Sequence, residues 1–394
     1  MLRRPKSTFM NTLSPHHAQQ ASRIARFPLV DGLKAIAAQL IVLHHFAAYG
    51  PVSHAAQRWL PNVVPWLYAH GRLAVQVFLV VSGYLAARGL SSSRTAVQTP
   101  WVDITNRYVR LLTPYLAALV LSVLCASWAR PWLPQDVVPD APTWAQWLAH
   151  AGLVQGLLGF EALSAGVWYV AMDFQLFAVL TLLVWAGRGA TRRTQTLVAA
   201  LCVASLLGFN RFAAFDNWAV YFFGAYGLGA LAWWARLRKD ASRSAQTLFL
   251  LAVLLGVAAL ELDFRPRIAL ALGVALVLVA WGHGSQPETQ NDSGTSLRAW
   301  VAHHLSISWG SAVQHLSQTS YALFLVHFSV LLLVNTLFAR LGLTQPGLAL
   351  CFAVAGWGVS LWAATGFHRW VESPDAPWRG VYWPRLALRS LLRY

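Results

Sequence analysis

A lysine and two adjacent histidines interrupt the first strongly apolar stretch of the chain, residues 31–46. Lys34 lies near the start of this stretch, and His44 and His45 lie near its end. An α-helix rises about 1.5 Å and turns about 100° per residue, so Lys34 and His45 share one face about 16 Å apart, whereas His44 points about 80° away. A cation and an imidazole inside an apolar helix are energetically costly, which favours a functional site. The alternative is a lysine that reaches the lipid headgroups and histidines that are packed and hydrogen-bonded.

Two arginines mark the start of another apolar stretch, where Arg107 and Arg110 precede Pro114. Residues three apart share a helix face, so the two guanidinium groups point the same way. Guanidinium groups bind phosphates through forked hydrogen bonds, and the pair is therefore a candidate phosphate-binding site. The alternative is a basic anchor at the cytoplasmic membrane surface.

A carboxylate lies within the apolar segment that begins at Trp168, at Asp173, and Gln175 follows it. A carboxylate in such a segment must be paired, protonated or in a wet cavity. We predict that Asp173 orients His45, as carboxylates orient imidazoles in catalytic sites. The alternative is a hydrogen bond between packed helices.

Three further polar residues lie near the end of the chain. Tyr321 and His327 belong to the apolar segment that Ser320 opens, and Glu372 comes just after the last apolar segment. A lone histidine in this setting is more often structural than catalytic. We expect Glu372 to pair with a basic residue at the inner membrane surface.

The composition is that of a polytopic membrane protein. Of 394 residues, 57% are hydrophobic and 11% are charged, and the mean hydropathy is +0.49, whereas a soluble domain has about 25% charged residues. The net charge of +16 comes mostly from loops between apolar segments, which argues against nucleic acid as a partner. The three cysteines lie in apolar segments and lack the spacing of a disulfide framework or metal site. We therefore expect membrane lipids as surroundings, no metal and no tightly bound cofactor.

The hydropathy pattern predicts an all-α bundle of about ten transmembrane helices. Loops on one side carry about three times as many Lys and Arg residues, which places both termini in the cytoplasm. The expected parts are a cytoplasmic tail over residues 1–27, a transmembrane domain over residues 28–375 and a basic cytoplasmic tail over residues 376–394. The predicted spans are residues 29–49, 71–90, 109–129, 163–186, 196–209, 217–235, 246–262, 267–283, 319–340 and 346–367.

Two loops are expected to contain helices, and one of them could also shape a binding site. The longest outer loop, residues 130–162, carries Asp136, Asp140 and Glu161 and could shape a binding site outside the membrane. Within it, residues 144–160 are apolar enough for an interfacial or re-entrant helix. In the last inner loop, residues 300–316 are expected to form an amphipathic surface helix.

The order and spacing of these motifs resemble the acyltransferase type 3 family, whose members are integral membrane acyltransferases. The resemblance covers residues 28–375, nearly the whole chain. The first motif of that family is an arginine, ten residues and a histidine; Lys34 stands here for the arginine and His45 for the histidine. Asp173 replaces a usual glutamate and Phe177 a usual tyrosine. The remaining motifs, in order, are Phe78 to Tyr84 with Ser82, Arg107 to Tyr115, Trp168 to Phe177, Ser320 to His327, and Glu372 to Pro374.

This resemblance implies an O-acyltransferase of the bacterial inner membrane. It would move an acyl group, most simply acetyl, from cytoplasmic acyl-CoA to a hydroxyl of a carbohydrate or lipid-linked glycan, alongside proteins of envelope-glycan biosynthesis. His45 would be a general base or carry the acyl group, with Asp173 as its partner. Lys34, Arg107 and Arg110 would bind the donor phosphates. Supporting roles would fall to His44, Ser82, Tyr84, Trp168, Gln175, Tyr321, His327 and Glu372.

Two other classes of protein fit the same polar residues. A transporter or flippase of a glycan precursor would use them to line a substrate path. A non-enzymatic scaffold would use them to hold helices together. The transporter would move its substrate without consuming acyl-CoA, and the scaffold would tolerate His45→Ala.

Overall fold

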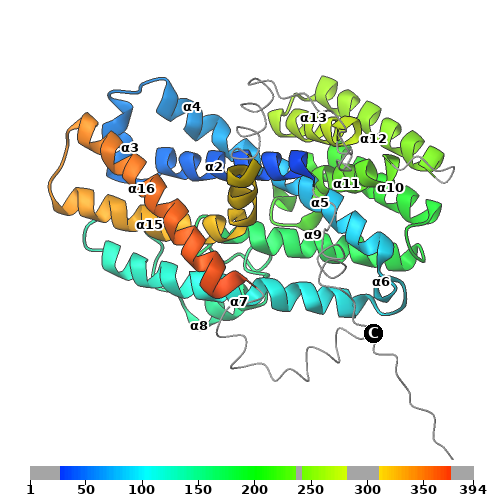
Figure 1. Cartoon of the computed structure of the whole chain (residues 1–394), viewed down its shortest axis with the longest axis horizontal. Coiled ribbons are helices and arrows are strands. Elements are labelled where there is room, and N and C mark those ends of the chain that lie inside the picture. Colours follow the sequence, from blue (N-terminus) through cyan, green and yellow to red (C-terminus); the bar gives the residue numbers. More distant parts are fainter. Residues whose placement is uncertain (1–26, 237–241, 282–309, 374–394) are drawn as a thin grey trace, which may run out of the picture.

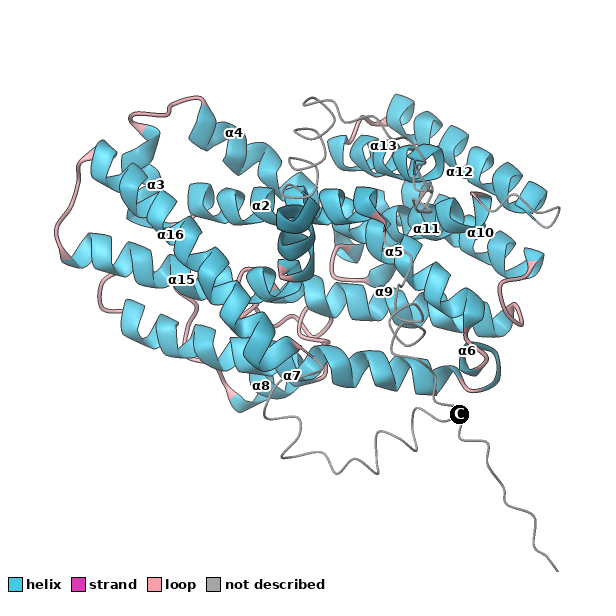
Figure 2. Cartoon of the chain, viewed as in Figure 1, coloured by secondary structure: helices cyan, strands magenta, loops and turns pink. Residues whose placement is uncertain are grey.

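The structure of the chain is a computed structural model that describes residues 27–236, 242–281 and 310–373 (Figure 1). Within these residues every regular element is a helix and no strand is present (Figure 2). The ten segments predicted as membrane spans all coincide with helices, so the all-α polytopic bundle is confirmed. These helices are α2 (Pro28–Ala48), α5 (Ala74–Ser92), α7 (Pro100–Ala129), α9 (Val167–Ala186), α10 (Arg192–Leu207), α11 (Ala219–Ala235), α12 (Ser242–Leu262), α13 (Pro266–Trp281), α15 (Ser320–Arg340) and α16 (Pro346–Phe367).

Three of the ten helices are short. In the described part of the chain, seven helices are long and apolar enough to cross a membrane, and α11 and α13 are shorter apolar helices. The third short helix is α10, which has 16 residues and is therefore about 24 Å long. All three lie together, because α11 packs against α5, α10, α12 and α13. Most residues of α11 are consequently buried by protein.

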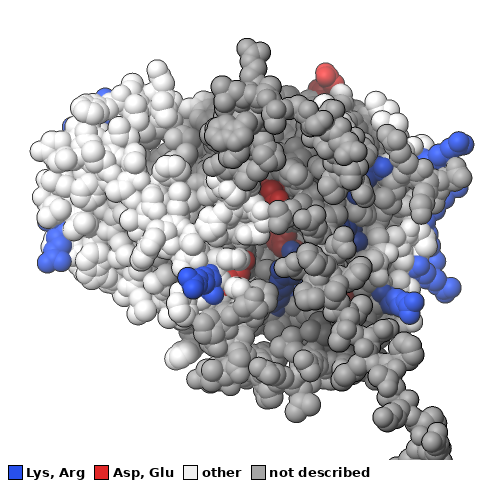
Figure 3. All heavy atoms as spheres, in the orientation of Figure 1, with Lys and Arg blue, Asp and Glu red and all other residues white. Residues whose placement is uncertain are grey.

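The bundle has two chemically different ends, at the right and left of Figure 1. The basic end surrounds α6 (Thr95–Gln98) and carries Arg94, Arg188, Arg192 and Arg193. Basic side chains accordingly gather along the right-hand edge in Figure 3. The opposite end, called the pocket end below, is formed by α3 (Gly50–Gln57), α4 (Val63–His70) and α8 (Trp144–Ala151).

The largest differences between the observed and predicted helix boundaries are at two places. The helix α7 begins at Pro100 instead of residue 109, because its first turn is polar: Asp103 accepts hydrogen bonds from the hydroxyls of Ser93 and Thr95 at 3.0 and 2.7 Å. The segment 144–160 is not one helix, since α8 ends at Ala151 and Leu153 takes a positive φ of 55°.

Several expectations concern residues that are only partly described. Residues 310–318 are helical and include the end of the surface helix expected over residues 300–316. The remainder of that helix and most of both predicted cytoplasmic tails lie outside the described residues.

The helices α5 and α11 approach each other with their backbones nearly in contact. A Cβ atom on Gly83 would overlap the carbonyl oxygen of Tyr226, and a Cβ atom on Gly229 would overlap that of Val80. Glycine is therefore required at both positions by close packing. The resulting pair of helices is a fixed frame that holds Ser82 and Tyr226 inside the bundle.

Candidate active site

Two histidines from helices far apart in the sequence meet inside the bundle. His45 Nδ1, on α2, lies 2.7 Å from His327 Nε2, on α15, and the two rings are nearly parallel, with an angle of 18° between their planes. His327 is fully buried and His45 is nearly so. On the other side of its ring, His327 Nδ1 lies 2.9 Å from the carbonyl oxygen of Leu323.

This hydrogen-bond chain assigns the tautomers of the two neutral rings. A carbonyl oxygen only accepts, so Nδ1 of His327 carries a hydrogen and its Nε2 is an acceptor. His327 Nε2 therefore accepts a hydrogen bond from Nδ1–H of His45. Nε2 of His45 is left with its lone pair, and no described residue donates to it. The chain thus presents the unprotonated nitrogen that a general base requires.

His45 lies on the wall of a cavity at the pocket end. The cavity has a volume of about 410 Å³ and is formed by α2, the start of α5 and α9, and the loop between α7 and α9. The outer loop predicted to shape a binding site thus lines the cavity beside His45. Its polar and aromatic wall consists of His44, His45, Tyr49, Arg72, Gln135, Asp136, Glu161, Ser164, Trp168, Phe324 and Phe328.

His44 points in a different direction from His45, as the helical spacing predicts. Its Nδ1 lies 3.2 Å from the carbonyl oxygen of Leu67 on α4, and its ring stacks on Tyr68. His44 also lines the cavity, but its contacts tie α2 to α4.

Asp173 does not contact His45, and the predicted pairing of these two residues is wrong. Its Oδ2 accepts a hydrogen bond from Nη2 of Arg107 at 2.5 Å, which forms a largely buried ion pair between α7 and α9. The guanidinium group also stacks on Phe177, 4.8 Å from the ring centre. Residue spacing along one helix carries no information on partners from other helices. The contacts Asp173–Arg107 and His45–His327 were therefore not predicted from the sequence.

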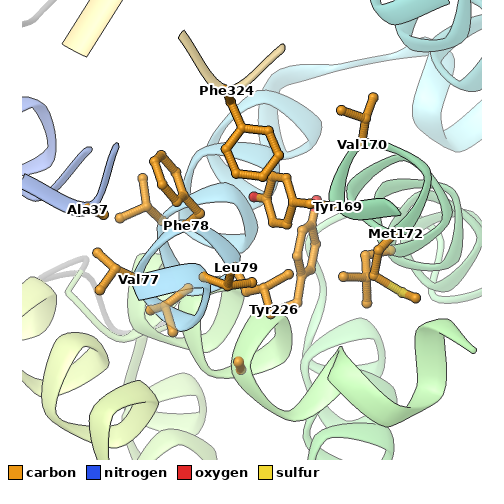
Figure 4. Packing of buried hydrophobic residues seen from close by; sticks show 14 of the residues in the cluster. Ala37, Val77, Phe78, Leu79, Tyr169, Val170, Met172, Tyr226 and Phe324 are labelled. Carbon is orange, nitrogen blue, oxygen red and sulfur yellow. The ribbon is translucent and has the colours of Figure 1, made fainter. Parts of the chain in front are cut away.

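Three aromatic side chains separate the Arg107–Asp173 pair from the two histidines. We call Phe78, Tyr169 and Phe324 the aromatic layer (Figure 4). The ring centre of Phe324 lies 5.2 Å from that of Tyr169 and 6.1 Å from that of His327. Tyr169 is in turn an electrostatic neighbour of Asp173 and Arg107. The layer therefore lies between two polar compartments.

On the basic side of the aromatic layer, charged groups from three segments (α2, α7 and the turn after α16) gather around Lys34. Asp31, Arg110 and Glu372 are the electrostatic neighbours of its ammonium group. Glu372 Oε2 lies 2.8 Å from His368 Nδ1, so the expected basic partner is a histidine four residues earlier. Arg110 is exposed. We call Lys34, Asp31, Arg110 and Glu372 the Lys34 cluster.

Comparison with known protein families decides the class of the chain. A family model described as an acyltransferase domain matches residues 27–366. The chain belongs to the acyltransferase type 3 family. It is therefore a membrane acyltransferase, and the transporter and scaffold alternatives are not favoured. No curated protein and no solved structure matches the chain.

The other residues expected to support the acyltransferase site lie in different parts of it. Ser82 Oγ lies 3.4 Å from the hydroxyl of Tyr169, next to the aromatic layer. Tyr321, on the basic side, donates to the carbonyl oxygen of Leu111 at 3.3 Å. Trp168 lines the cavity.

Two expected supporting residues hold the acyltransferase fold rather than the site. The hydroxyl of Tyr84 accepts a hydrogen bond from Arg236 at 2.7 Å, near the basic end. Gln175 donates to the carbonyl oxygen of Leu153 at 2.9 Å and thereby ties α9 to the loop after α8.

Sequence reasoning missed several residues of the cavity wall. Tyr49 stacks on His45, with ring centres 5.8 Å apart, but it directly follows the end of α2 with extended backbone, so helical spacing could not indicate this contact. Arg72 and Ser164 come from segments with no motif of their own, so only the folded chain places them beside His45.

Proposed function

We propose that this protein transfers an acyl group, most simply acetyl, from cytoplasmic acyl-CoA to a hydroxyl of a cell-envelope carbohydrate. The bacterial inner membrane is the proposed location, with the basic end in the cytoplasm as the positive-inside rule requires. The observation that carries the proposal is the histidine pair, which leaves Nε2 of His45 as a base on the wall of a cavity.

His45 acts as general base in this mechanism. Its Nε2 accepts the proton of the acceptor hydroxyl while the oxygen attacks the thioester carbonyl carbon. The tetrahedral intermediate collapses, the carbon–sulfur bond breaks and the thiolate takes the proton from His45. His327 accepts the hydrogen bond from Nδ1–H of His45 throughout and holds the ring in the required tautomer. Transient acylation of His45 itself is the alternative route to the same products.

The donor approaches from the basic end. Lys34 and the exposed Arg110 are the proposed ligands of its phosphates, because both are cations of one cluster on that side of the aromatic layer. Arg107 is a weaker candidate than the sequence suggested, since its guanidinium group is already paired with Asp173.

The acceptor approaches from the pocket end. Tyr49 and Trp168 offer flat apolar faces, and Gln135, Asp136 and Glu161 offer hydrogen-bonding groups, which together suit a polyhydroxylated ring. A cavity of about 410 Å³ has room for one or two sugar rings at the reacting position, so the rest of a longer glycan would extend outside.

The proposal is tested by incubating the purified protein with acetyl-CoA and an envelope glycan fraction as acceptor. The quantity measured is the release of free CoA. We expect His45→Ala to lower the rate by about 10²–10⁴-fold, the usual contribution of a general base. His70→Ala is the matched control, because this exposed histidine lies at the same end and its hydrogen bond and ring stacking are with Trp66 of its own helix. Mass spectrometry of envelope glycans with and without the gene would identify the acyl group. Equal CoA release by wild type and His45→Ala would refute the mechanism.

A further inference from the structure

The centre of the bundle contains buried polar atoms without hydrogen-bond partners. Oδ1 of Asp173, Nε of Arg107 and the hydroxyl of Tyr226 are all buried, and none is hydrogen-bonded to any described residue. Tyr226 itself is fully buried. Buried polar groups are normally hydrogen-bonded, because an unpaired one retains its full desolvation cost. Three such groups together therefore indicate a ligand-binding position.

These three groups belong to one site. Arg107 and Asp173 form the ion pair described above, and both are electrostatic neighbours of the Tyr226 hydroxyl. Figure 4 shows Tyr226 extending from α11 toward Tyr169, which belongs to the aromatic layer. The side chain of Arg107 is 29% exposed, so the site can be reached although its polar atoms are buried.

The chemistry of the site matches a secondary amide. A secondary amide needs one acceptor for its N–H and one donor for its carbonyl oxygen. Oδ1 of Asp173 is a strong acceptor, and the Arg107 guanidinium and the Tyr226 hydroxyl are donors. An ion or a phosphate fits poorly, because the opposite charges of Arg107 and Asp173 already compensate each other.

The position of the site also matches such a group in the proposed donor. Tyr321 is an electrostatic neighbour of Glu372 in the Lys34 cluster and of the Arg107–Asp173 pair. On the other side, the aromatic layer connects the pair to His327. The site thus lies between the proposed phosphate ligands and the proposed reaction centre. In acyl-CoA, the pantetheine arm with its secondary amides lies between the phosphates and the thioester.

We propose that Asp173, Arg107 and Tyr226 bind a secondary amide of the pantetheine arm of the donor. This inference rests on the proposed function, since it takes acyl-CoA as the donor. Asp173 then holds the donor in register with His45 and is a binding residue instead of the partner of the base.

Competitive inhibition by two fragments of CoA tests the proposal. Pantetheine contains the amides but no phosphate, and adenosine 3′,5′-bisphosphate contains phosphates but no amide. In Tyr226→Phe we expect the inhibition constant of pantetheine against acetyl-CoA to rise about tenfold, the loss of one hydrogen bond, and that of the nucleotide to stay unchanged. Arg110→Ala should give the opposite pattern. Tyr221→Phe, on the same helix but stacked under Arg267, is the matched control.

If Tyr226 had only a structural role, Tyr226→Phe would not change any inhibition constant. The Tyr226 hydroxyl has no hydrogen-bond partner among the described residues, so its removal should also leave the melting temperature unchanged. An unchanged pantetheine constant in an active Tyr226→Phe variant would therefore overturn the amide site and leave the proposed function intact. A wild-type protein that releases no CoA from acetyl-CoA would overturn both.

Discussion

The proposed chemistry depends on the histidine pair. His327 orders His45 because its own Nδ1–H is fixed by the Leu323 carbonyl. We predict that His327→Phe, which removes the acceptor for His45 Nδ1–H, lowers kcat without raising KM for the donor. The decrease in kcat should be no larger than the decrease of about 10²–10⁴-fold expected for His45→Ala.

Comparison with His44→Ala separates this role from packing. His44 bonds to a backbone carbonyl of α4, so its removal should leave measurable activity. Steady-state kinetics of the three variants in detergent or nanodiscs measures this. An inactive His44→Ala beside an active His45→Ala would mean that the reactive ring has been assigned to the wrong histidine.

Donor phosphates give a second residue-scale prediction. Arg110→Ala should raise the KM for acetyl-CoA by about 10–100-fold with little change in kcat, because a charged hydrogen bond is worth about 1.5–3 kcal/mol. Lys34→Arg should remain active, since a positive charge is what the Lys34 cluster supplies. An unchanged KM in a folded Arg110→Ala variant would exclude the phosphate contact.

The direction of a site residue on its own helix can be predicted from the sequence, but the contacts between site residues on different helices cannot. The spacing in α2 correctly separates His45 from His44, because a helix fixes relative direction. The contacts His45–His327 and Arg107–Asp173 join residues 282 and 66 positions apart. Such contacts depend on how helices pack, which no local spacing encodes.

At the scale of elements, the frame formed by α5 and α11 depends on Gly83. In Gly83→Ala the new methyl group would meet the backbone carbonyl of Tyr226, which cannot rotate away. We predict a loss of about 1–3 kcal/mol, the usual cost of overpacking. Gly89→Ala on the same helix is the control, because no atom lies within 4 Å of its Cβ position. Thermal unfolding in detergent should show a lower transition for Gly83→Ala only.

The loop that lines the cavity is held by another histidine. His150, in α8, donates from Nδ1 to the Gln146 carbonyl at 2.8 Å and accepts at Nε2 from the Leu163 backbone N–H at 3.2 Å. Burial lowers the pKa of His150 below its ordinary value of 6.5, so the neutral ring is preferred. Its contribution to stability is complete above pH 6.5 and falls as the pH drops toward the lowered pKa.

Hydrogen exchange of the Leu163 amide, corrected for the intrinsic effect of pH, measures this. We predict strong protection at pH 7.5 and a loss of protection on acidification, whereas His150→Phe should exchange quickly at every pH. Equal protection at pH 7.5 and 5 would contradict the assignment.

Helix positions could be predicted where the length of an apolar segment sets them. They could not be predicted where polar contacts set the helix boundary. All ten segments predicted from hydropathy are helices, and seven described helices are long and apolar enough to cross a membrane. The early start of α7 depends on hydrogen bonds between Asp103 and the hydroxyls of Ser93 and Thr95, and the break after α8 depends on a left-handed residue, Leu153. Neither feature changes the hydropathy profile.

For the whole molecule, the proposed mechanism requires the two ends to face different compartments. We predict that an impermeant maleimide labels Asp140→Cys in intact cells, and Arg193→Cys only after permeabilisation, in a background without Cys125, Cys202 and Cys351. Both positions are exposed, at the pocket end and the basic end respectively. The reverse pattern would place the Lys34 cluster on the outside and exclude cytoplasmic acyl-CoA as its ligand.

The aromatic layer has a consequence for the energy supply of the cell. With charged groups on one side and a polar cavity on the other, Phe78, Tyr169 and Phe324 form part of the electrical insulation of the membrane. A narrow apolar constriction excludes water and blocks ions. A passage held wide open for a thioester would conduct protons and dissipate the gradient that drives ATP synthesis. In the proposed mechanism the layer must therefore close around the donor arm as it moves, so the permeability of the membrane to ions limits how far these three side chains can separate during turnover.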